Sequence, residues 1–280
     1  MNDKGTKAYR QSQAIPARII IISKILQTFS QKLAVKYAAK LFVTPLKHTI
    51  PKREFEMDKN SVQTRLRVSS INKEIILYQY GNSPKKALLA HGWSGRGTQL
   101  TRIADRLLAL GFCTFSFDAP GHGKAPGITT NMTEFIESVL FIHKNYGPFQ
   151  IGIGHSLGGM TLLNAVNRGL PLQKLITIAS GDKVVDIIDD FIEKIGLRPE
   201  IAPKLKANFD KKLGSDINLL SASFAAENVK IPVLVMHDED DTDVPVSAGK
   251  EIHKNLKNGK LLITKKLGHR KILGNEAVLK

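Results

Sequence analysis

The fold is decided by the segment GHSLGG at residues 154–159. An apolar run at residues 150–154 predicts a strand before Ser156, and the spacing of residues 157–168 predicts a helix after it. A G-x-S-x-G turn between a strand and a helix is sharp and strained, and its small flanking residues let the backbone make the turn. Such a turn lifts the serine hydroxyl above the carboxyl edge of a sheet. Ser156 is therefore the candidate nucleophile.

A serine hydroxyl is a poor nucleophile without a base, and both required partners follow Ser156 in the chain. HDEDDTDVP at residues 237–245 comes directly after a predicted strand at 231–236. LGH at residues 267–269 comes after a predicted strand at 260–264. Ligands of open α/β sheets bind outside the carboxyl ends of the strands, so both segments should lie near Ser156. His269 is the candidate base, and the orienting acid is expected among the aspartates of residues 238–243.

Strands and helices alternate on both sides of this segment. The patterns predict strands at residues 62–68, 74–80, 87–91, 112–118, 150–154, 174–179, 231–236 and 260–264. They predict helices at residues 99–110, 132–146, 157–168 and 247–256, with Asn131 as an N-cap. This alternation indicates the α/β class, with a mostly parallel sheet covered by helices on both faces.

Residues 181–230 interrupt this alternation and are too long for a simple crossover. They contain helical patterns at residues 184–195, 200–213 and 217–228 and no strand pattern. We interpret them as an inserted helical lid, between core segments at 54–180 and 231–280. Its apolar residues form either a face of the lid or, as we favour, its own core: Phe191, Ile195, Leu197 and Phe209.

Residues 1–53 form a basic N-terminal extension. They hold eleven Lys or Arg and one acid, which gives +10 of the chain's net charge of +16. Apolar residues recur at helical steps between Ile22 and Phe42, as one helix or two short ones, with Lys32, Lys36 and Lys40 on a common face. We favour a helix packed on the main domain with a solvated basic side. The alternative is weak association with an anionic membrane surface.

Composition limits the other classes of function. The 280 residues are 42% hydrophobic and 24% charged, as in a globular domain with some extra structure. Without zinc-finger spacing or an aromatic-basic motif, we expect no specific nucleic-acid binding. Cys113 is the single cysteine, and the apolar run at residues 19–22 is too short for a signal peptide. We therefore expect a cytoplasmic protein, with the inner membrane surface as the peripheral alternative.

Five segments in order make the resemblance to a known superfamily specific. They are HGWSGR at 91–96, DAPGHG at 118–123, GHSLGG at 154–159, HDEDDTDVP at 237–245 and LGHRKIL at 267–273. Residues 33–273 resemble a bacterial, esterase-like branch of the α/β-hydrolase superfamily. The resemblance implies the α/β-hydrolase fold and a triad in the order Ser, Asp, His. Relatives of this type usually carry a longer final helix, so a short final helix or a truncated chain is expected.

The resemblance also selects individual residues. Two residues separate its acid from a Val-Pro pair, which implies Asp241, with Asp240 as the alternative. Two backbone N–H groups should form the oxyanion hole. Leu157 follows the nucleophile directly, and the resemblance implies Trp93 as the second donor. Arg96 follows Trp93 closely and either meets an anionic substrate group or, as we favour, forms a structural ion pair.

These parts predict a serine hydrolase that cleaves a carboxylic ester or thioester of a small acyl substrate through an acyl-enzyme on Ser156. Haloperoxidases, C–C hydrolases and acyltransferases share the same triad, so one of these reactions is the first alternative. The second alternative is a non-catalytic membrane-surface or interaction protein with the same fold. No G-x-G-x-x-G, Walker or H-E-x-x-H pattern occurs, so we expect neither an organic cofactor nor a metal site. His91 and His122 are expected to brace loops, and His237 to lie buried near the acid.

Overall fold

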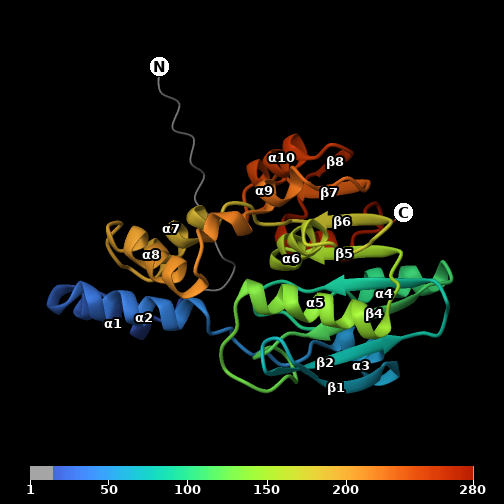
Figure 1. Cartoon of the computed structure of the whole chain (residues 1–280), viewed down its shortest axis with the longest axis horizontal. Helices are drawn as coiled ribbons and strands as arrows, with labels where there is room; N and C mark the ends of the chain where they lie inside the picture. Colours follow the sequence, from blue (N-terminus) through green and yellow to red (C-terminus); the bar gives the residue numbers. More distant parts are fainter. Residues whose placement is uncertain (1–14, 280) are drawn as a thin grey trace.

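The computed structural model describes residues 15–279, and their strands form one sheet in the order β1-β2-β4-β3-β5-β6-β7-β8 (Figure 1). The strands are β1 (Val62–Val68), β2 (Lys73–Tyr80), β3 (Lys86–Ala90), β4 (Cys113–Asp118), β5 (Ile151–His155), β6 (Lys174–Ile178), β7 (Val233–Asp238) and β8 (Gly259–Thr264). Strand β2 pairs antiparallel with β1 and β4, and every other pair is parallel. The predicted mostly parallel sheet is confirmed.

Two groups of helices cover the two faces of the sheet. One face carries α5 (Met132–Tyr146), α6 (Leu157–Asn167), α9 (Ala222–Ala226) and α10 (Val246–Asn255). The other carries α3 (Phe55–Asn60), α4 (Thr101–Ala109) and the short η3 (Ile272–Gly274). Side chains alternate along the strands, so that Leu88 joins the first core and its neighbours Ala87 and Leu89 join the second. This alternation produces a sheet buried on both faces.

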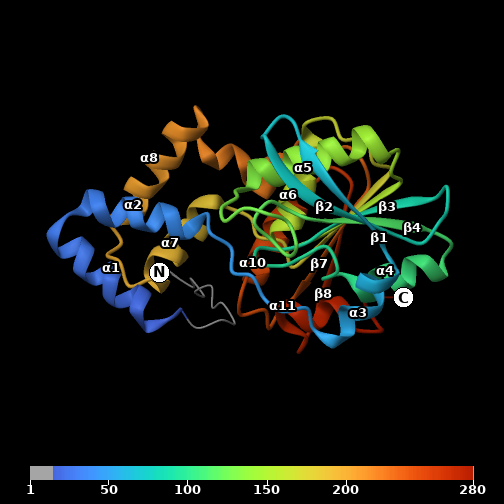
Figure 2. The ribbon, with the colours of Figure 1, turned by 90° about the horizontal axis from the view of Figure 1, so that it is seen from below.

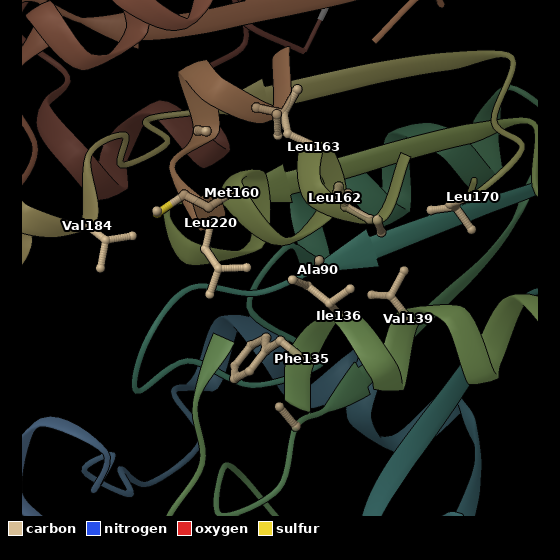
Figure 3. Close-up of a cluster of buried hydrophobic side chains, with 14 of the residues drawn as sticks. Ala90, Phe135, Ile136, Val139, Met160, Leu162, Leu163, Leu170, Val184 and Leu220 are labelled. Atoms are coloured by element: carbon tan, nitrogen blue, oxygen red, sulfur yellow. The ribbon is translucent and has the colours of Figure 1, made fainter. Parts of the chain in front are cut away.

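Helices α5 and α6 form the centre of the larger core. Phe135, Ile136 and Val139 of α5 lie near Ala90 of β3, and Leu162 of α6 belongs to the same cluster (Figure 3). The predicted N-cap of α5 is confirmed, because the Asn131 side chain accepts a hydrogen bond of 3.1 Å from the backbone N–H of Glu134. Packing of α6 on β5 fixes the turn between them, where Ser156 lies.

Four helices lie beyond the end of the sheet at which β5 leads into α6 (Figures 1 and 2). They are α1 (Ala17–Phe29), α2 (Gln31–Phe42), α7 (Val184–Lys194) and α8 (Ile201–Leu213). Ser30 separates α1 from α2 in an extended conformation and caps α2, so the N-terminal pattern forms two helices. Phe42 of α2 contacts Phe191 and Phe209, with ring centroids 5.1 and 5.2 Å away. Residues 1–14 of the predicted extension lie outside the described residues.

One predicted helix is wrong. Residues 217–228 form a 3-10 turn, η2 (Ile217–Leu220), followed by the short helix α9. The chain is extended at Ser221, and the Asp182 carboxylate accepts a 2.7 Å hydrogen bond from the Ser223 N–H. This distant acid starts a new helix where the apolar pattern suggested a continuous one. The sequence analysis also missed η1 (Lys52–Glu54), α3, η3 and the short α11 (Gly268–Lys271).

The described part of the chain holds no helix that combines the length and the apolar character needed to cross a bilayer.

Candidate active site

Ser156 occupies a strained turn between β5 and α6. Its backbone angles are φ 54° and ψ −119°, a combination that costs a non-glycine residue energy. Close backbone contacts explain the neighbouring glycines: a Cβ on Gly154 would lie 2.3 Å from the Gly158 carbonyl oxygen. A Cβ on Gly158 would lie 2.1 Å from the carbonyl oxygen of Ala90. The turn therefore requires glycine on both sides of the serine and presents Ser156 to a cavity.

His269 and Asp241 meet although 28 residues separate them. The Nδ1 of His269 lies 2.8 Å from Asp241 Oδ2. The second carboxylate oxygen of Asp241 accepts hydrogen bonds of 2.8 Å from the backbone N–H groups of Asp243 and Val244, which fixes its orientation. The carboxylate accepts a hydrogen bond from Nδ1–H, so Nε2 is the nitrogen of His269 left to act as a base.

The alternative acid, Asp240, has another partner. Its Oδ2 accepts a 2.8 Å hydrogen bond from the backbone N–H of Lys266, and the residue is exposed. Of the two acids that the sequence left open, the structure thus brings Asp241 to His269. The role of Asp241 in catalysis stays a prediction.

Burial opposes ionisation of Asp241, but hydrogen bonds from His237 and His269 outweigh it and hold the pKa of this carboxyl below its usual range. His237 is fully buried, with Nε2 3.5 Å from Asp241 Oδ2 and 3.0 Å from the Val244 carbonyl oxygen. The expected position of His237 near the acid is confirmed. Asp241 is therefore a carboxylate at neutral pH and can stabilise a positive charge on His269.

Asp238 holds the loop of His269, a role that the sequence analysis missed. Its carboxylate accepts hydrogen bonds from the Thr264 hydroxyl at 2.7 Å and from the Gly268 N–H at 2.9 Å. The Leu267 N–H donates a third bond at 3.1 Å. Its position at the end of β7, beside the end of β8, is the sequence signal that could have indicated this role.

The loop after β3 is braced by buried histidines, as the sequence predicted. His91 lies 2.7 Å from the Gly92 carbonyl oxygen through Nδ1, and its Nε2 accepts a 3.2 Å bond from the Ala119 N–H. His122 Nε2 accepts a 3.0 Å bond from the Ser94 N–H. Burial lowers the pKa of His91 to about 4, so its ring is neutral. These bonds fix the loop that carries Trp93.

The two predicted oxyanion donors border the same cavity as Ser156. Among residues 15–279, the backbone N–H of Trp93 makes no hydrogen bond. Leu157 is the first residue of α6, where helical N–H groups have no partner within the helix. A Cβ on Gly92 would lie 3.0 Å from the Cβ of Ser156, so this loop packs directly on the turn. The function of the Trp93 and Leu157 N–H groups as oxyanion donors stays a prediction.

Arg96 forms the structural ion pair that we favoured. Its guanidinium lies 3.5 Å from Glu54 Oε2 and donates a 3.0 Å bond to the Thr49 carbonyl oxygen. Thr98 completes the cluster by donating a 2.7 Å bond to the same Glu54 oxygen. The cluster joins the loop after β3 to the segment that follows α2.

Ser156 and His269 both line a cavity of about 740 Å³. The part of its wall that comes from α1, α2, α6, α7 and α8 is mainly apolar, whereas residues 43–54 and 129–134 add polar and charged side chains. Representative residues of this wall are Ile19, Leu41, Phe42, Met160, Ile187, Phe191 and Phe209. Phe191, Ile195 and Phe209 border the cavity and also pack in the core. The two alternatives for these side chains, an apolar face of the lid and the lid's own core, are therefore each correct in part.

Two curated proteins resemble parts of the chain. One is the pimeloyl-[acyl-carrier protein] methyl ester esterase of Chromobacterium violaceum, 35% identical over 80 residues, which are 29% of this chain and 30% of that protein. The other is lysophosphatidylserine lipase ABHD12 of Danio rerio, 26% identical over 192 residues, which are 64% of this chain and 46% of that protein. The matches span less than half the length of either relative.

Solved structures resemble the fold at low sequence identity. An esterase of Exiguobacterium antarcticum superimposes with a TM-score of 0.60 at 17% identity, over 76% of this chain and 94% of that one. The sequence pattern of the alpha/beta hydrolase family matches residues 87–269, a segment that includes Trp93, Ser156, Asp241 and His269. This match covers more than half of the sequence, and the chain belongs to the alpha/beta hydrolase family.

Proposed function

We propose that the chain is a serine hydrolase that cleaves a carboxylic ester or thioester through an acyl-enzyme on Ser156. The observation that carries this proposal is the 2.8 Å contact between His269 Nδ1 and Asp241 Oδ2, because His269 lines the same cavity as Ser156. A base that is oriented by a buried carboxylate is what a serine hydroxyl needs to become a nucleophile. As part of the same proposal, we assign the chain to a bacterial, esterase-like branch of the family, and the five sequence segments that resemble this branch support the assignment.

The proposed reaction has two halves. Ser156 Oγ attacks the carbonyl carbon while His269 Nε2 takes its proton, and a tetrahedral oxyanion forms. The imidazolium of His269 then protonates the leaving alcohol or thiol as the bond to the acyl carbon breaks. Water attacks the resulting acyl-serine, with His269 again removing a proton. The same histidine returns that proton to Ser156 Oγ as the carboxylic acid leaves.

Each half of the reaction develops negative charge on one oxygen. In our proposal the backbone N–H groups of Trp93 and Leu157 donate to that oxygen, and the ionised Asp241 stabilises the imidazolium of His269. Removal of one oxyanion donor typically costs about 10²–10³ in rate. Both proposed donors are backbone groups, so their positions are fixed by the turn at Ser156 and by the loop that His91 braces.

The cavity favours a substrate with an apolar acyl group. Pockets of about 300–1,000 Å³ accommodate ligands of drug or short lipid size, and this cavity of about 740 Å³ lies in that range. Its aromatic and aliphatic wall would bury methylene groups, each worth about 0.8 kcal/mol. The names of the two curated relatives, an esterase and a lipase, agree with an acyl ester.

A series of p-nitrophenyl esters of increasing acyl length tests the proposal. We expect turnover whose kcat/KM rises with acyl length until the cavity is filled. Ser156→Ala should lower kcat by about 10³-fold or more. Ser247→Ala, at an exposed position in α10, is the matched control and should leave kcat unchanged. Ester turnover that survives Ser156→Ala at the wild-type rate would rule out the proposed acyl-enzyme.

A further inference from the structure

Helix α1 is apolar around most of its circumference. Of its 13 residues only Arg18 and Lys24 are charged. One side packs inward, with Ile19 and Leu26 against the core. A helix that is apolar on all sides is normally buried on all sides. The outward side of α1 is not covered by any described residue. We therefore expect an apolar partner to cover it.

The exposed side of α1 continues into α2 as one surface. Ile21, Ile25 and Phe29 recur at steps of four residues, which places them on the same side of the helix. The surface, which we call the α1 face, consists of Ile21, Ile22, Ile25, Phe29 and Leu33, with exposed fractions of 57%, 41%, 51%, 82% and 50%. These five are among the fourteen exposed large hydrophobic residues of the described chain, so such residues are concentrated here.

A basic hollow borders the α1 face. It measures about 760 Å³ between α2 and α8, and its lining includes Leu33 and four lysines, Lys32, Lys36, Lys204 and Lys212. Leu33 belongs to both surfaces and makes them continuous. Within the described chain none of these four lysines lies within ion-pair distance of an acidic side chain. Residues 15–53, which include α1 and α2, contain no Asp or Glu.

We propose that the α1 face and the lysines of this hollow dock the protein on the surface of a bilayer that contains anionic lipids. Apolar side chains beside lysines that have no acidic partner match the boundary between acyl chains and anionic headgroups. Each Lys near such a surface contributes roughly a fivefold gain in partitioning. A second copy of the chain fits less well, because a two-fold contact through the α1 face would bring two sets of lysines together.

The same helices reach the candidate active site. Ile19 of α1 and Lys212 of α8 line the cavity that contains Ser156 and His269. In both views α1 lies at the end of the molecule farthest from the sheet, with α7 and α8 beside the helix pair (Figures 1 and 2). Docking through the α1 face would hold this cavity close to the bilayer, where acyl esters reside. This consequence rests on the proposed function, whereas the docking itself does not.

Vesicle flotation of the full chain tests the docking. One set of vesicles contains phosphatidylcholine alone, and the other an equal mixture of phosphatidylcholine and phosphatidylserine. We expect flotation with the mixed vesicles, much weaker flotation with phosphatidylcholine, and loss of the difference in high salt. Ser156→Ala should float like the wild type, so failure of docking and failure of the proposed catalysis are separate results.

Two sets of substitutions test the two parts of the surface. Replacing Ile22, Ile25 and Phe29 by Gln removes the apolar part, and replacing Lys32, Lys36 and Lys204 by Gln removes charge. Each set should lower partitioning into mixed vesicles by about ten- to a hundredfold. None of these six side chains lines the Ser156 cavity, so turnover of a soluble short-chain ester should not change.

Matched controls carry the same changes on other surfaces. Replacing Val62, Leu110 and Ile128 by Gln removes three exposed apolar side chains elsewhere, and replacing Lys254, Lys257 and Lys260 by Gln removes an equal charge. Both controls should float like the wild type. If they lose binding as strongly as the test sets, general hydrophobicity or net charge causes the binding and the proposal is wrong.

A spectroscopic probe locates the contact independently of affinity. In Phe29→Trp, tryptophan emission should shift to the blue on mixed vesicles and be quenched by brominated lipids, whereas Ile128→Trp should show neither effect. Trp93 contributes the same background to both variants. The proposal is overturned if the wild-type chain does not float with mixed vesicles, if the Phe29→Trp emission stays unshifted, or if light scattering shows a dimer that Phe29→Gln dissociates while vesicles stay unbound.

Discussion

His155 and His269 join the nucleophile turn to the loop of the candidate base. The Nε2 of His155 lies 2.9 Å from the backbone carbonyl oxygen of His269 and donates a hydrogen bond to it, across 114 residues of chain. The two rings are in contact, with centroids 4.6 Å apart and their planes tilted by 49°. Burial, followed by the neighbouring His269, lowers the pKa of His155 to about 3, so the bond is made by a neutral ring.

This bond predicts a positioning role for His155. His155→Ala should lower kcat by about ten- to a hundredfold with a smaller change in KM, because the loop of His269 loses a fixed point near Ser156. The free energy of unfolding should fall by about 1–3 kcal/mol. His155→Gln keeps an N–H donor and should restore part of kcat. A merely structural role is indicated if stability falls while kcat at low temperature stays at the wild-type value.

Asp241 and Asp240 provide a matched pair of carboxylates. Asp241→Asn should lower kcat by about 10⁴-fold, because the amide no longer stabilises the imidazolium or fixes the tautomer of His269. Asp240→Asn should change kcat by less than about tenfold, since its carboxylate contacts the Lys266 N–H and not His269. Steady-state kinetics on one soluble ester measures both. Equal losses in the two variants would contradict the assignment of Asp241.

Gly92 tests the packing of the loop on the nucleophile turn. A methyl group there would meet Ser156 Cβ at 3.0 Å and His155 Nδ1 at 3.2 Å, so the turn or the loop must shift by a few tenths of an ångström. We expect Gly92→Ala to lower kcat by about tenfold or more and stability by about 1–3 kcal/mol. Gly274→Ala, whose methyl would meet Arg102 at an ordinary 3.5 Å, should leave both unchanged. Wild-type kcat in Gly92→Ala would mean that this contact does not constrain the site.

Buried neutral histidines should destabilise the protein in acid. The pKa of His91 is about 4 in the folded chain and about 6.5 when unfolded, so between these values only the unfolded chain binds the proton. The pKa of His155 is also lowered by burial, so this ring destabilises the folded chain in acid in the same way. Stability is retained above about pH 6.5 and falls below it by about 1.4 kcal/mol per pH unit for each ring. Protonation of Asp241 adds to this loss of stability only below about pH 4, because folding lowers the pKa of this carboxyl.

Urea unfolding at a series of pH values between about 7 and 4 measures this loss. His91→Asn has no titrating group at this position and should show a shallower decline than the wild type. A free energy of unfolding that stays constant over this range would contradict the description of these rings as buried and neutral.

Much of the fold was predictable because each element carries its own signal. Strands with apolar runs and helices with three- and four-residue spacing were located to within one or two residues, and the GHSLGG turn located Ser156. The order of segments pointed to His269. Among several neighbouring aspartates, local pattern alone did not separate Asp241 from Asp240. Only the positions of Lys266 and His269 in space do so.

The remaining features depend on contacts between distant parts of the chain. The bond from His155 to His269 and the clamp by Asp238 arise only when β5, β7 and β8 lie side by side. The break at Ser221 depends on Asp182, 39 residues earlier. The α1–α2 pair gave a clear helical pattern, but its place in the wall of the Ser156 cavity follows from packing on α8.

The activated state of Ser156 is the central claim, and labelling with a fluorophosphonate followed by peptide mapping tests it most directly. The reagent reacts with a serine only when a base and an oxyanion site act on it. We predict a single adduct on Ser156 of the folded protein, strongly slowed in His269→Ala and absent in Ser156→Ala. Folded protein that forms no adduct, or that is labelled at another serine such as Ser94 or Ser180 while Ser156 stays free, would contradict the account.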